Sequence, residues 1–304
     1  MEHKKSFFLT QGAIIGLMAA AGTACLGFFL FATLNSSAVK NKQNLSIDTT
    51  SVKAGTQQRL ENITNSMQAS WQKEARAKGF SFSWIPQRFQ GVVLEEAKLT
   101  KSPKVIALTF DDGPNPPYTT EILDTLKKNN IKATFFVIGQ NAKIYPDYLK
   151  RIVAEGHAIG NHTWHHWYHH MSPQVAAYEI DNTNKVIQDV TGVKTNLFRP
   201  PGGHLSNGLA SYAKNQKFGV IMWSSDSIDY RQPPVPTLMK NILRNSRPGG
   251  IVLMHDGGGK RGNTAKALPE LIETYKKQGY SFVTVPELLE MQDKEQKNVT
   301  AMKK

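Results

Sequence analysis

Two adjacent aspartates are the first residues along the chain whose types and spacing suggest chemistry. Asp111 and Asp112 follow the apolar run Val105–Phe110 and precede a Gly-Pro pair. Asp-Gly-Pro is common in turns, so two turn-capping aspartates are one interpretation. Neighbouring carboxylates point in different directions, so the pair also fits two separate roles, one on a metal and one beside a water molecule.

A histidine-rich stretch offers further ligands for such a metal. His162 and His166 are four residues apart, a spacing that places both on one face of a helical turn. Two imidazoles and a carboxylate leave positions open on a divalent metal for water and substrate. The pairs His165/His169 and His166/His170 have the same spacing, so this stretch alone leaves the choice of ligands open.

Three further segments carry polar side chains next to apolar runs. Arg199 can hold a carboxylate through two hydrogen bonds, and the Pro-Pro-Gly turn after it leaves the backbone N–H of Gly202 accessible to a developing oxyanion. Asp229 and His255 lie in the other two segments, and a histidine near a carboxylate favours its protonated form and can serve as a general acid. An ordinary Pro/Gly turn and a core histidine are the plain alternatives.

The elements that must position these residues alternate between short apolar runs and amphipathic stretches. The apolar runs are Val105–Phe110, Ala133–Ile138, His157–Gly160, Thr195–Phe198, Val220–Trp223, Ile251–Met254 and Ser281–Val285. The amphipathic stretches are Thr119–Lys128, Asp147–Glu155, Pro173–Val190, Leu205–Asn215, Pro236–Asn245 and Thr264–Gln278. This alternation predicts an α/β fold with a parallel sheet of about seven strands. Polar residues follow several runs, which favours a distorted (β/α) barrel over an open sheet with one switch point.

Together, the five segments resemble the catalytic motifs of one family. Between residues 103 and 290 they read Thr-Phe-Asp-Asp-Gly-Pro, His-Thr-x-x-His, Arg-x-Pro, Asp-x-x-Asp-aromatic and Leu-x-His. These blocks are similar to those of the polysaccharide deacetylases, carbohydrate esterase family 4, also called the NodB homology domain. The resemblance implies a distorted (β/α) barrel, one divalent metal and removal of N-acetyl groups from amino sugars in polymers. Zinc is the expected ion, and cobalt, nickel or iron also suits an Asp/His/His ligand set.

The resemblance also implies a role for each matching residue. By motif position, the implied metal ligands are Asp112, His162 and His166, and the implied general base is Asp111, held by Arg199. The implied general acid is His255, oriented by Asp229, and the oxyanion donor is the N–H of Gly202. The residues implied to line the sugar groove are Trp164, Pro201, Tyr230 and Leu253. Two positions depart from the family pattern. Gly202 stands where tyrosine is usual, which removes one wall of the groove, and Tyr230 stands where tryptophan is usual.

The N-terminal region predicts a membrane anchor. No Asp, Glu, Lys or Arg occurs from Ser6 to Val39, and the segment Gly12–Leu34 is long enough to cross a hydrocarbon layer of ~30 Å. Lys4 and Lys5 before it favour a cytoplasmic N-terminus. We therefore expect a single-pass cell-membrane protein with its catalytic domain on the outer side. Secretion after signal-peptide cleavage is the alternative.

The amino-acid composition limits the classes of partner that we expect for this protein. The chain has 37 Lys and Arg against 24 Asp and Glu, a net charge of +13, which indicates a polyanionic neighbour. One cysteine in 304 residues excludes an intramolecular disulfide framework and a cysteine-based zinc cluster. Because the expected topology places the basic part outside the cell, we expect an anionic cell-wall polymer as the partner and no nucleic acid.

These observations predict four parts and one reaction. The expected parts are residues 1–39 as cytoplasmic tip and anchor, 40–102 as spacer and helical region (helix over 59–78), 103–290 as the catalytic domain and 291–304 as a polar tail. The expected reaction is metal-dependent removal of N-acetyl groups from N-acetylglucosamine in peptidoglycan, with release of acetate. The alternatives are deacetylation of chitin oligomers or poly-N-acetylglucosamine, an inactive wall-binding protein, and a metal amidohydrolase of small cyclic amides. The sequence leaves open both the oligomeric state and the choice between N-acetylglucosamine and N-acetylmuramic acid.

Overall fold

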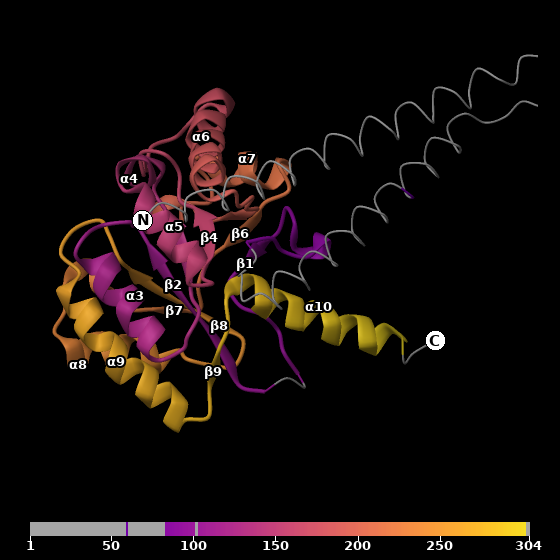
Figure 1. The fold of residues 1–304 in the computed structure, drawn as a ribbon. Coiled ribbons are helices and arrows are strands. Elements are labelled where there is room, and N and C mark those ends of the chain that lie inside the picture. Colours follow the sequence, from indigo (N-terminus) through magenta and orange to yellow (C-terminus); the bar gives the residue numbers. More distant parts are fainter. Residues whose placement is uncertain (1–58, 60–82, 101–102, 302–304) are drawn as a thin grey trace, which may run out of the picture. The chain divides into compact units, whose positions relative to one another are not determined.

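The computed structural model describes residue 59 and residues 83–100 and 103–301. The elements shown in Figure 1 belong to one compact unit, Thr64–Lys304. No helix within the described ranges is long and apolar enough to cross a membrane. The expected anchor and, apart from Arg59, the expected helix over 59–78 fall outside the described residues.

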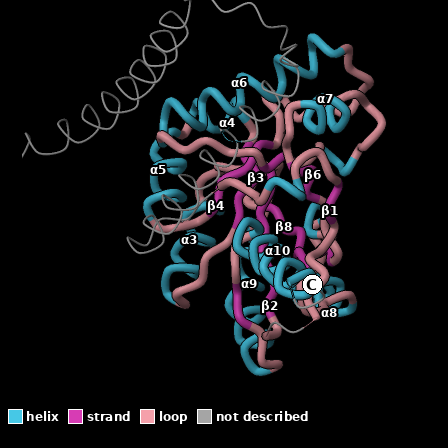
Figure 2. Tube along the Cα trace, turned by 90° about the vertical axis from the view of Figure 1, so that its right-hand side faces the viewer, coloured by secondary structure: helices cyan, strands magenta, loops and turns pink. Residues whose placement is uncertain are grey.

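A curled sheet of parallel strands lies at the centre of the unit, with helices around it (Figure 2). Over the described residues the strand order is β1-β6-β5-β4-β3-β2-β8-β7, and β9 pairs with the start of β2. The strands are β1 (Val93–Leu94), β2 (Val105–Asp111), β3 (Thr134–Val137), β4 (Ala158–Asn161), β5 (Leu197–Phe198), β6 (Gly219–Ile221), β7 (Ser225–Asp226), β8 (Gly250–His255) and β9 (Ser281–Phe282). The arrangement is a half-barrel, consistent with the expected distorted (β/α) barrel.

The described part of the sheet contains nine strands, whereas the sequence predicts about seven. The two that the pattern misses, β1 and β7, are two-residue strands at the ends of the sheet. A run of two residues carries no periodicity, and its pairing is decided by the neighbouring strand. β1 pairs with β6, and β7 pairs with β8.

Eight helices in the described ranges surround the sheet. They are α3 (Tyr118–Lys128), α4 (Gly139–Ile144), α5 (Pro146–Ala154), α6 (Pro173–Thr191), α7 (Leu209–Asn215), α8 (Val235–Arg244), α9 (Gly262–Lys277) and α10 (Val285–Ala301). Helix α6 illustrates how the sequence sets their limits. The hydroxyl of Ser172 accepts the N–H of Val175 at its start, and Gly192 ends it in the left-handed region with φ 73°.

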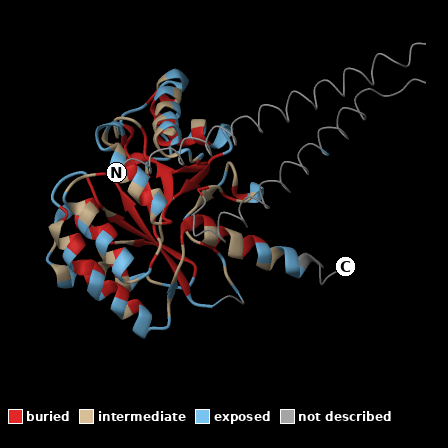
Figure 3. Cartoon of the chain, viewed as in Figure 1, coloured by how far each residue is buried: buried red, intermediate tan, exposed pale blue. Residues whose placement is uncertain are grey.

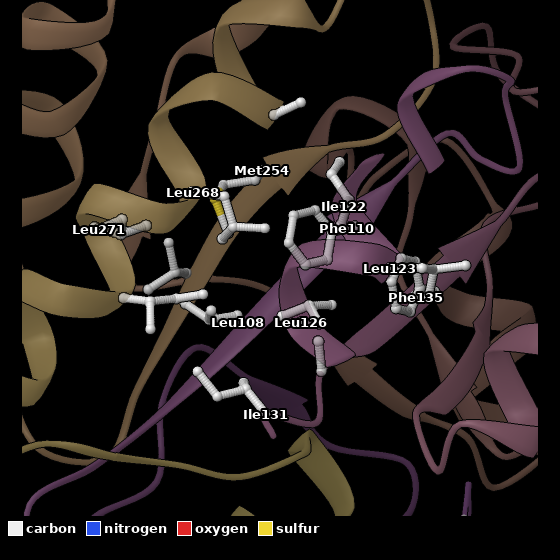
Figure 4. Close-up of a cluster of buried hydrophobic side chains, with 14 of the residues drawn as sticks. Leu108, Phe110, Ile122, Leu123, Leu126, Ile131, Phe135, Met254, Leu268 and Leu271 are labelled. Carbon is white, nitrogen blue, oxygen red and sulfur yellow. The ribbon is translucent and has the colours of Figure 1, made fainter. Parts of the chain in front are cut away.

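Strand β2 divides the core into two clusters because side chains alternate across a strand. Ile106, Leu108 and Phe110 pack in the larger cluster beneath α3, α8 and α9 (Figure 4). Val105 and Ala107 face the other cluster, inside the curled sheet. The same alternation places Thr109 and Asp111 on this inner side, above the apolar residues. Figure 3 shows that the central strands of the sheet are buried.

Helix α10 and the segment before β1 close the inner cluster. Ile85 and Phe89 pack there with Leu288 and Leu289 of α10. Farther along the helix, Asp293 is buried and lies 2.6 Å from the Nε atom of Arg88. The helix continues through Ala301, so the domain end expected at residue 290 falls inside it.

Parallel pairing gives every strand the same direction. The carboxyl ends of β2, β4, β5, β7 and β8 therefore lie along one rim of the sheet. The sequence predicts its candidate residues at these strand ends, and the fold brings them to this rim.

Candidate active site

The aspartate pair sits where β2 ends. Asp111 is the last strand residue and lies in register with Phe136 of β3 and His255 of β8. Asp112 follows in the left-handed region, with φ 73°, which is uncommon for a residue with a side chain. The change of backbone conformation sends the two carboxylates to different partners, as the sequence predicts. Both are buried.

Asp112, His162 and His166 come together as a group that can hold a metal ion. Each offers one ligand atom, and these atoms all lie within 4.8 Å of one another. The Oδ1 atom of Asp112 lies 3.4 Å from Nε2 of His162 and 3.1 Å from Nε2 of His166. Ligands bound at about 2.1 Å in a tetrahedron would be about 3.4 Å apart. Oδ1 of Asp112 is buried without a hydrogen-bond partner in the described structure, so the residues present fit a divalent cation.

The backbone around the two histidines differs from the helical turn that their spacing predicts. Residues 162–170 form a loop after β4, in which Thr163 (φ 68°) and His166 (φ 65°) are left-handed. The side chain of Asn161 accepts the N–H of Thr163 at 2.8 Å, and the hydroxyl of Thr163 accepts the N–H of His166 at 3.0 Å. These side-chain acceptors replace helical hydrogen bonds. The prediction of a helical turn is wrong, although the two imidazoles do converge.

Glu179 of α6 holds this loop and also accounts for one of the competing histidines. Its side chain is fully buried, and Oε2 accepts the N–H groups of Trp164 (3.0 Å) and His165 (2.8 Å). Its Oε1 lies 2.5 Å from Nδ1 of His165. The ring of His165 is therefore held by Glu179, away from the metal-binding group. His169 and His170 are exposed.

His157 is a structural histidine. It is buried, and its Nδ1 accepts the N–H of Ala133 at 3.1 Å. Burial, together with the charges of Lys132 and Arg151, lowers the pKa of His157 to about 3. It is therefore neutral at physiological pH and supports the start of β3.

A backbone carbonyl group fixes the orientation of the His162 ring. Its Nδ1 lies 2.7 Å from the carbonyl oxygen of Arg199, which can only accept. Nδ1 therefore carries the proton and donates, and Nε2 is left with a lone pair directed at the metal-binding group. Arg199 thus supports one ligand through its backbone.

The guanidinium of Arg199 holds the other aspartate. It is completely buried, and Nη1 donates to Oδ1 of Asp111 at 2.7 Å. The expected two-point contact is a single bond, because Nε and Nη2 donate instead to the carbonyls of Ile221 and Met222. Burial lowers the pKa of Arg199, and the charge of Asp111 opposes that shift. Oδ2 of Asp111 remains directed toward the ligand group, 3.7 Å from Nε2 of His162.

His255 and Asp229 form a pair at the end of β8, where His255 lies in register with Asp111; Asp229 is buried and His255 is mostly buried. The Nδ1 atom of His255 lies 2.6 Å from Oδ1 of Asp229, whose Oδ2 accepts the backbone N–H of His255 and the hydroxyl of Thr264. Burial alone would lower the pKa of His255, but the hydrogen bond and charge of Asp229, with the charges of Asp112 and Asp111, raise it to about 9. His255 is therefore protonated at neutral pH.

The turn after Arg199 contains Gly202, whose backbone N–H is the expected oxyanion donor. Pro201–Gly203 form a single 3₁₀ turn in which Gly202 is left-handed, with φ 61°. A Cβ atom at Gly202 would lie 2.8 Å from Cε1 of Tyr168, so the tyrosine ring occupies the space that a side chain there would need. The wall expected to be missing at Gly202 is therefore formed by Tyr168, whose ring is half exposed and lies 5.1 Å from that of His166.

The four expected groove residues differ in exposure. Tyr230 is exposed, and its ring lies edge-on to His255 at 5.9 Å. Trp164 is half-buried and packs over Gly139 of α4. Leu253 and Pro201 are buried. Tyr230 and Tyr168 are thus exposed, whereas Leu253 and Pro201 are not.

The sequence-based reasoning missed Tyr168, Glu179 and Thr264. Tyr168 lies two residues after the candidate ligand His166, and this proximity in the sequence could have indicated that it lies at the site. Glu179 and Thr264 lie on helices that the sequence predicts, in positions read only as parts of amphipathic stretches. A buried acid on a helix facing a loop has no local signature, because its partners come from another part of the chain.

Comparison with known proteins places the chain in a family. Residues 98–221 match the family model of polysaccharide deacetylase. A peptidoglycan-N-acetylglucosamine deacetylase from Bacillus cereus is 40% identical over 189 residues, covering 61% of this chain and 88% of the relative. The peptidoglycan-N-acetylmuramic acid deacetylase PdaC of Bacillus subtilis is 37% identical over 198 residues, covering 65% of this chain and 41% of the relative.

A solved structure supports the same assignment. The crystal structure of the Bc1960 peptidoglycan N-acetylglucosamine deacetylase matches with a TM-score of 0.62 and 34% identity, covering 67% of this chain and 94% of that one. The five motifs, the rim on which they meet and these matches agree. The chain belongs to the polysaccharide deacetylase family.

Proposed function

We propose that this protein is a metal-dependent hydrolase that removes N-acetyl groups from N-acetylglucosamine residues of peptidoglycan and releases acetate. One observation carries the proposal. Asp112, His162 and His166 converge within 4.8 Å at the rim where Asp111 and the His255–Asp229 pair also lie. A ligand group, a free carboxylate oxygen and a protonated histidine are the three parts that amide hydrolysis needs.

The ligand group and Asp111 serve the attack on the amide. Asp112, His162 and His166 would hold a divalent cation, with zinc as the expected ion, which would supply Lewis-acid chemistry at the acetamide carbonyl and make a water more acidic. Oδ2 of Asp111 takes the proton from the attacking water, while the guanidinium of Arg199 holds Oδ1 in place. The backbone N–H of Gly202 donates to the oxyanion as it develops.

His255 serves the departure of the amine. Its pKa of about 9 keeps the imidazole protonated at neutral pH, and Asp229 holds Nδ1. Nε2 therefore carries the proton that passes to the leaving nitrogen. The amine remains on the sugar, and acetate leaves.

Relatives and charge support peptidoglycan as the substrate. The relatives described above are named for peptidoglycan deacetylation, one on N-acetylglucosamine and one on N-acetylmuramic acid. A net charge of +13 favours an anionic polymer. Chitin oligomers are the second candidate, because a protein of Azorhizobium caulinodans named chitooligosaccharide deacetylase is 31% identical over 208 residues.

We also propose where the other parts of the chain lie relative to the membrane. Residues 1–39 form a cytoplasmic tip and membrane anchor, and a spacer follows them. The catalytic domain lies on the outer side of the cell membrane and extends beyond the expected 103–290, because the segment before β1 and helix α10 pack into its core. The uncharged run from Ser6 to Val39 supports this arrangement. Recovery of the full-length chain in the membrane fraction would agree with it, and a mature chain beginning after residue 38 would favour secretion instead.

The test measures acetate released from purified peptidoglycan by the full chain. We expect Asp111→Asn and His255→Ala each to lower kcat by about 10²–10⁴-fold, because each removes a proton-transfer group. His170→Ala, in an exposed histidine outside the ligand group, is the matched control and should retain activity.

Three results would change the proposal. Turnover near that of the unmodified protein in Asp111→Asn or His255→Ala would remove that residue from the scheme. Binding to peptidoglycan without acetate release by the metal-loaded protein would favour the inactive wall-binding alternative. Turnover of chitin oligomers alone would move the substrate to the second candidate.

A further inference from the structure

A polar pocket lies next to the His255–Asp229 pair and takes no part in the scheme above. Its volume is about 220 Å³. Its lining comes from the segment at η3 (Asp229–Arg231), from the loop after β8, from Tyr118 and from the start of α9. The lining residues are Tyr118, Asp229, Gln232, Lys260, Arg261, Gly262, Asn263 and Thr264.

Arg261 is a buried cation in this lining. Its relative exposure is 3%. Nη1 donates to the carbonyl of Lys260 at 3.0 Å and Nη2 to the carbonyl of Gly258 at 2.9 Å, while Nε has no hydrogen-bond partner among the described residues. A guanidinium has five N–H donors, so most of its capacity is unused. No carboxylate of the described residues forms an ion pair with the guanidinium of Arg261, so this buried charge is not directly paired.

The start of α9 adds a second source of positive potential. The helix has 16 residues, its cap residue Arg261 makes no side-chain capping bond, and its first turn contains no acidic residue. The first N–H groups of a helix lack intrahelical partners and favour an anion. Gly262, Asn263 and Thr264 of this first turn all line the pocket, and the exposed Lys260 adds a further positive charge.

The one acidic group in the lining does not neutralise the pocket. Both oxygens of Asp229 are engaged, Oδ1 with Nδ1 of His255 and Oδ2 with the backbone N–H of His255 and the hydroxyl of Thr264. The charge of Asp229 is thus paired with that of His255. Lys260 and Arg261 then leave the lining with an excess of positive charge.

Only one glycine separates Arg261 from the ligand group. A Cβ atom at Gly258 would lie 2.2 Å from Oδ2 of Asp112 and 3.3 Å from Nη2 of Arg261. Arg261 therefore lies close to the ligand group, where the proposed function places the reacting sugar. The flat fork of a guanidinium matches a carboxylate.

We propose that this pocket is a carboxylate-binding subsite, formed by Arg261, Lys260 and the start of α9. The inference rests on the proposed function, because that function brings two carboxylates to the rim. One is the lactyl carboxylate of a muramic acid that carries no stem peptide, and the other is the acetate that the reaction releases. Both present the same chemistry to the guanidinium, and the experiment separates them.

The first arm compares two tetrasaccharides of equal length. One alternates N-acetylglucosamine with N-acetylmuramic acid, and the other is chitotetraose, which has no carboxylate. Dissociation constants are measured with the full chain by calorimetry, beside KM and kcat from acetate release. We expect the protein to bind the carboxylated sugar about tenfold more tightly, and Arg261→Gln and Lys260→Gln each to reduce this preference to about twofold or less.

Two controls separate the role of the pocket from a general effect of charge and from a failure to fold. Lys266→Gln removes the same charge from an exposed position farther along α9 and should keep the full preference. Lys260 is itself exposed, so Lys260→Gln tests the pocket even where Arg261→Gln fails to fold. The affinity of Lys260→Gln for chitotetraose should match that of the unmodified protein.

The second arm titrates free acetate. Saturable acetate binding that is lost in Arg261→Gln and Lys260→Gln, without any glycan preference, would assign the pocket to the product. Glycan preference and acetate affinity that both match those of Lys266→Gln would overturn the proposal. The protein could also prefer the carboxylated sugar through Arg261 but release no acetate from any glycan. That result would contradict the proposed function and still support the carboxylate-binding subsite.

Discussion

At the scale of single residues, each carboxylate of the rim has its own partner and therefore its own role. Asp111 is held by Arg199, Asp112 faces two imidazoles, and Asp229 is bound to His255. Burial alone would raise the pKa of all such carboxyl groups. The partners of Asp112 and Asp229 reverse that effect and lower their pKa values, so that both are ionised at neutral pH.

The His255–Asp229 pair predicts a specific dependence on pH. The pKa of His255 is about 9, above its ordinary value of 6.5, so the acid is protonated below pH 9 and is lost as the pH rises through that value. A bound cation would shield the contributions of Asp111 and Asp112, which places the alkaline limb of kcat/KM at or below pH 9. In Asp229→Asn the hydrogen bond to a charged partner is lost, so the limb should move toward pH 6.5.

The measurement is kcat/KM for acetate release from pH 5 to 10 in both proteins. We expect Asp229→Asn to lose more activity at pH 8 than at pH 6. Alkaline limbs at the same pH in the two proteins would contradict the assignment of His255 as the acid.

Glu179 predicts a positioning effect on metal binding. It touches no ligand directly but holds the N–H groups of Trp164 and His165, between His162 and His166. We expect Glu179→Gln to weaken metal affinity about 10–100-fold, as removal of supporting contacts around metal ligands does. The dissociation constant is measured by competition with a chelating dye, and addition of excess metal should restore most of the activity.

Asp189→Asn is the matched control for this prediction. It removes one negative charge from an exposed position on the same helix, where Asp189 pairs with Lys185. Its metal affinity should equal that of the unmodified protein. If both variants lost metal affinity equally, the effect of Glu179→Gln would come from the loss of a negative charge and not from the hydrogen bonds of Glu179.

At the scale of the elements, strand ends supply the reacting groups and loops orient them. β2 presents Asp111 in register with His255 at the end of β8, which fixes these two groups relative to each other. The loop after β4 is held by acceptors on Asn161, Thr163 and Glu179. The strands therefore set the distances between groups, and the loops set their orientation.

Helix α10 predicts that the fold extends beyond residue 290. The helix packs Leu288 and Leu289 into the inner cluster, and Gln292 and Asp293 farther along it are also buried. We expect truncation after residue 290 to cost about 1–3 kcal/mol, because it removes buried contacts and the partner of Arg88. Thermal denaturation should show Tm lower by about 2–10 °C.

At the scale of the whole molecule, charge sets how the protein meets its substrate. The chain carries +13 over 304 residues, whereas the rim itself holds several paired or ligating carboxylates. The excess positive charge thus lies mainly outside the paired groups of the site. It favours attraction to an anionic polymer over short distances, because salt screens exposed charges beyond about 8 Å at physiological ionic strength.

This charge predicts a dependence of activity on salt that differs between substrates. Raising NaCl from about 0.05 to 0.5 M should raise KM for peptidoglycan several-fold, because screening weakens the attraction of exposed lysines and arginines to the polymer. KM for chitotetraose, which is neutral, should change little. Equal salt effects on both substrates would show that the charge of the protein plays no part in substrate capture.

The sequence by itself determined the alternation of strands and helices, the parallel sheet and the position of the reacting residues at strand ends. Apolar periodicity is a local property, so it can be detected from neighbouring residues alone. The spacing of His162 and His166 also indicated their convergence, but the choice among the histidines depended on the family resemblance.

Only the tertiary structure decided which groups touch. It showed that Glu179 shapes the histidine loop, that Tyr168 fills the space beside Gly202, that Arg199 gives Asp111 one bond instead of two, and that α10 extends past residue 290. Each of these contacts joins side chains whose proximity depends on how whole elements pack. Local spacing carries no information about such packing, because it is fixed by the burial of the sheet and its helices as a unit.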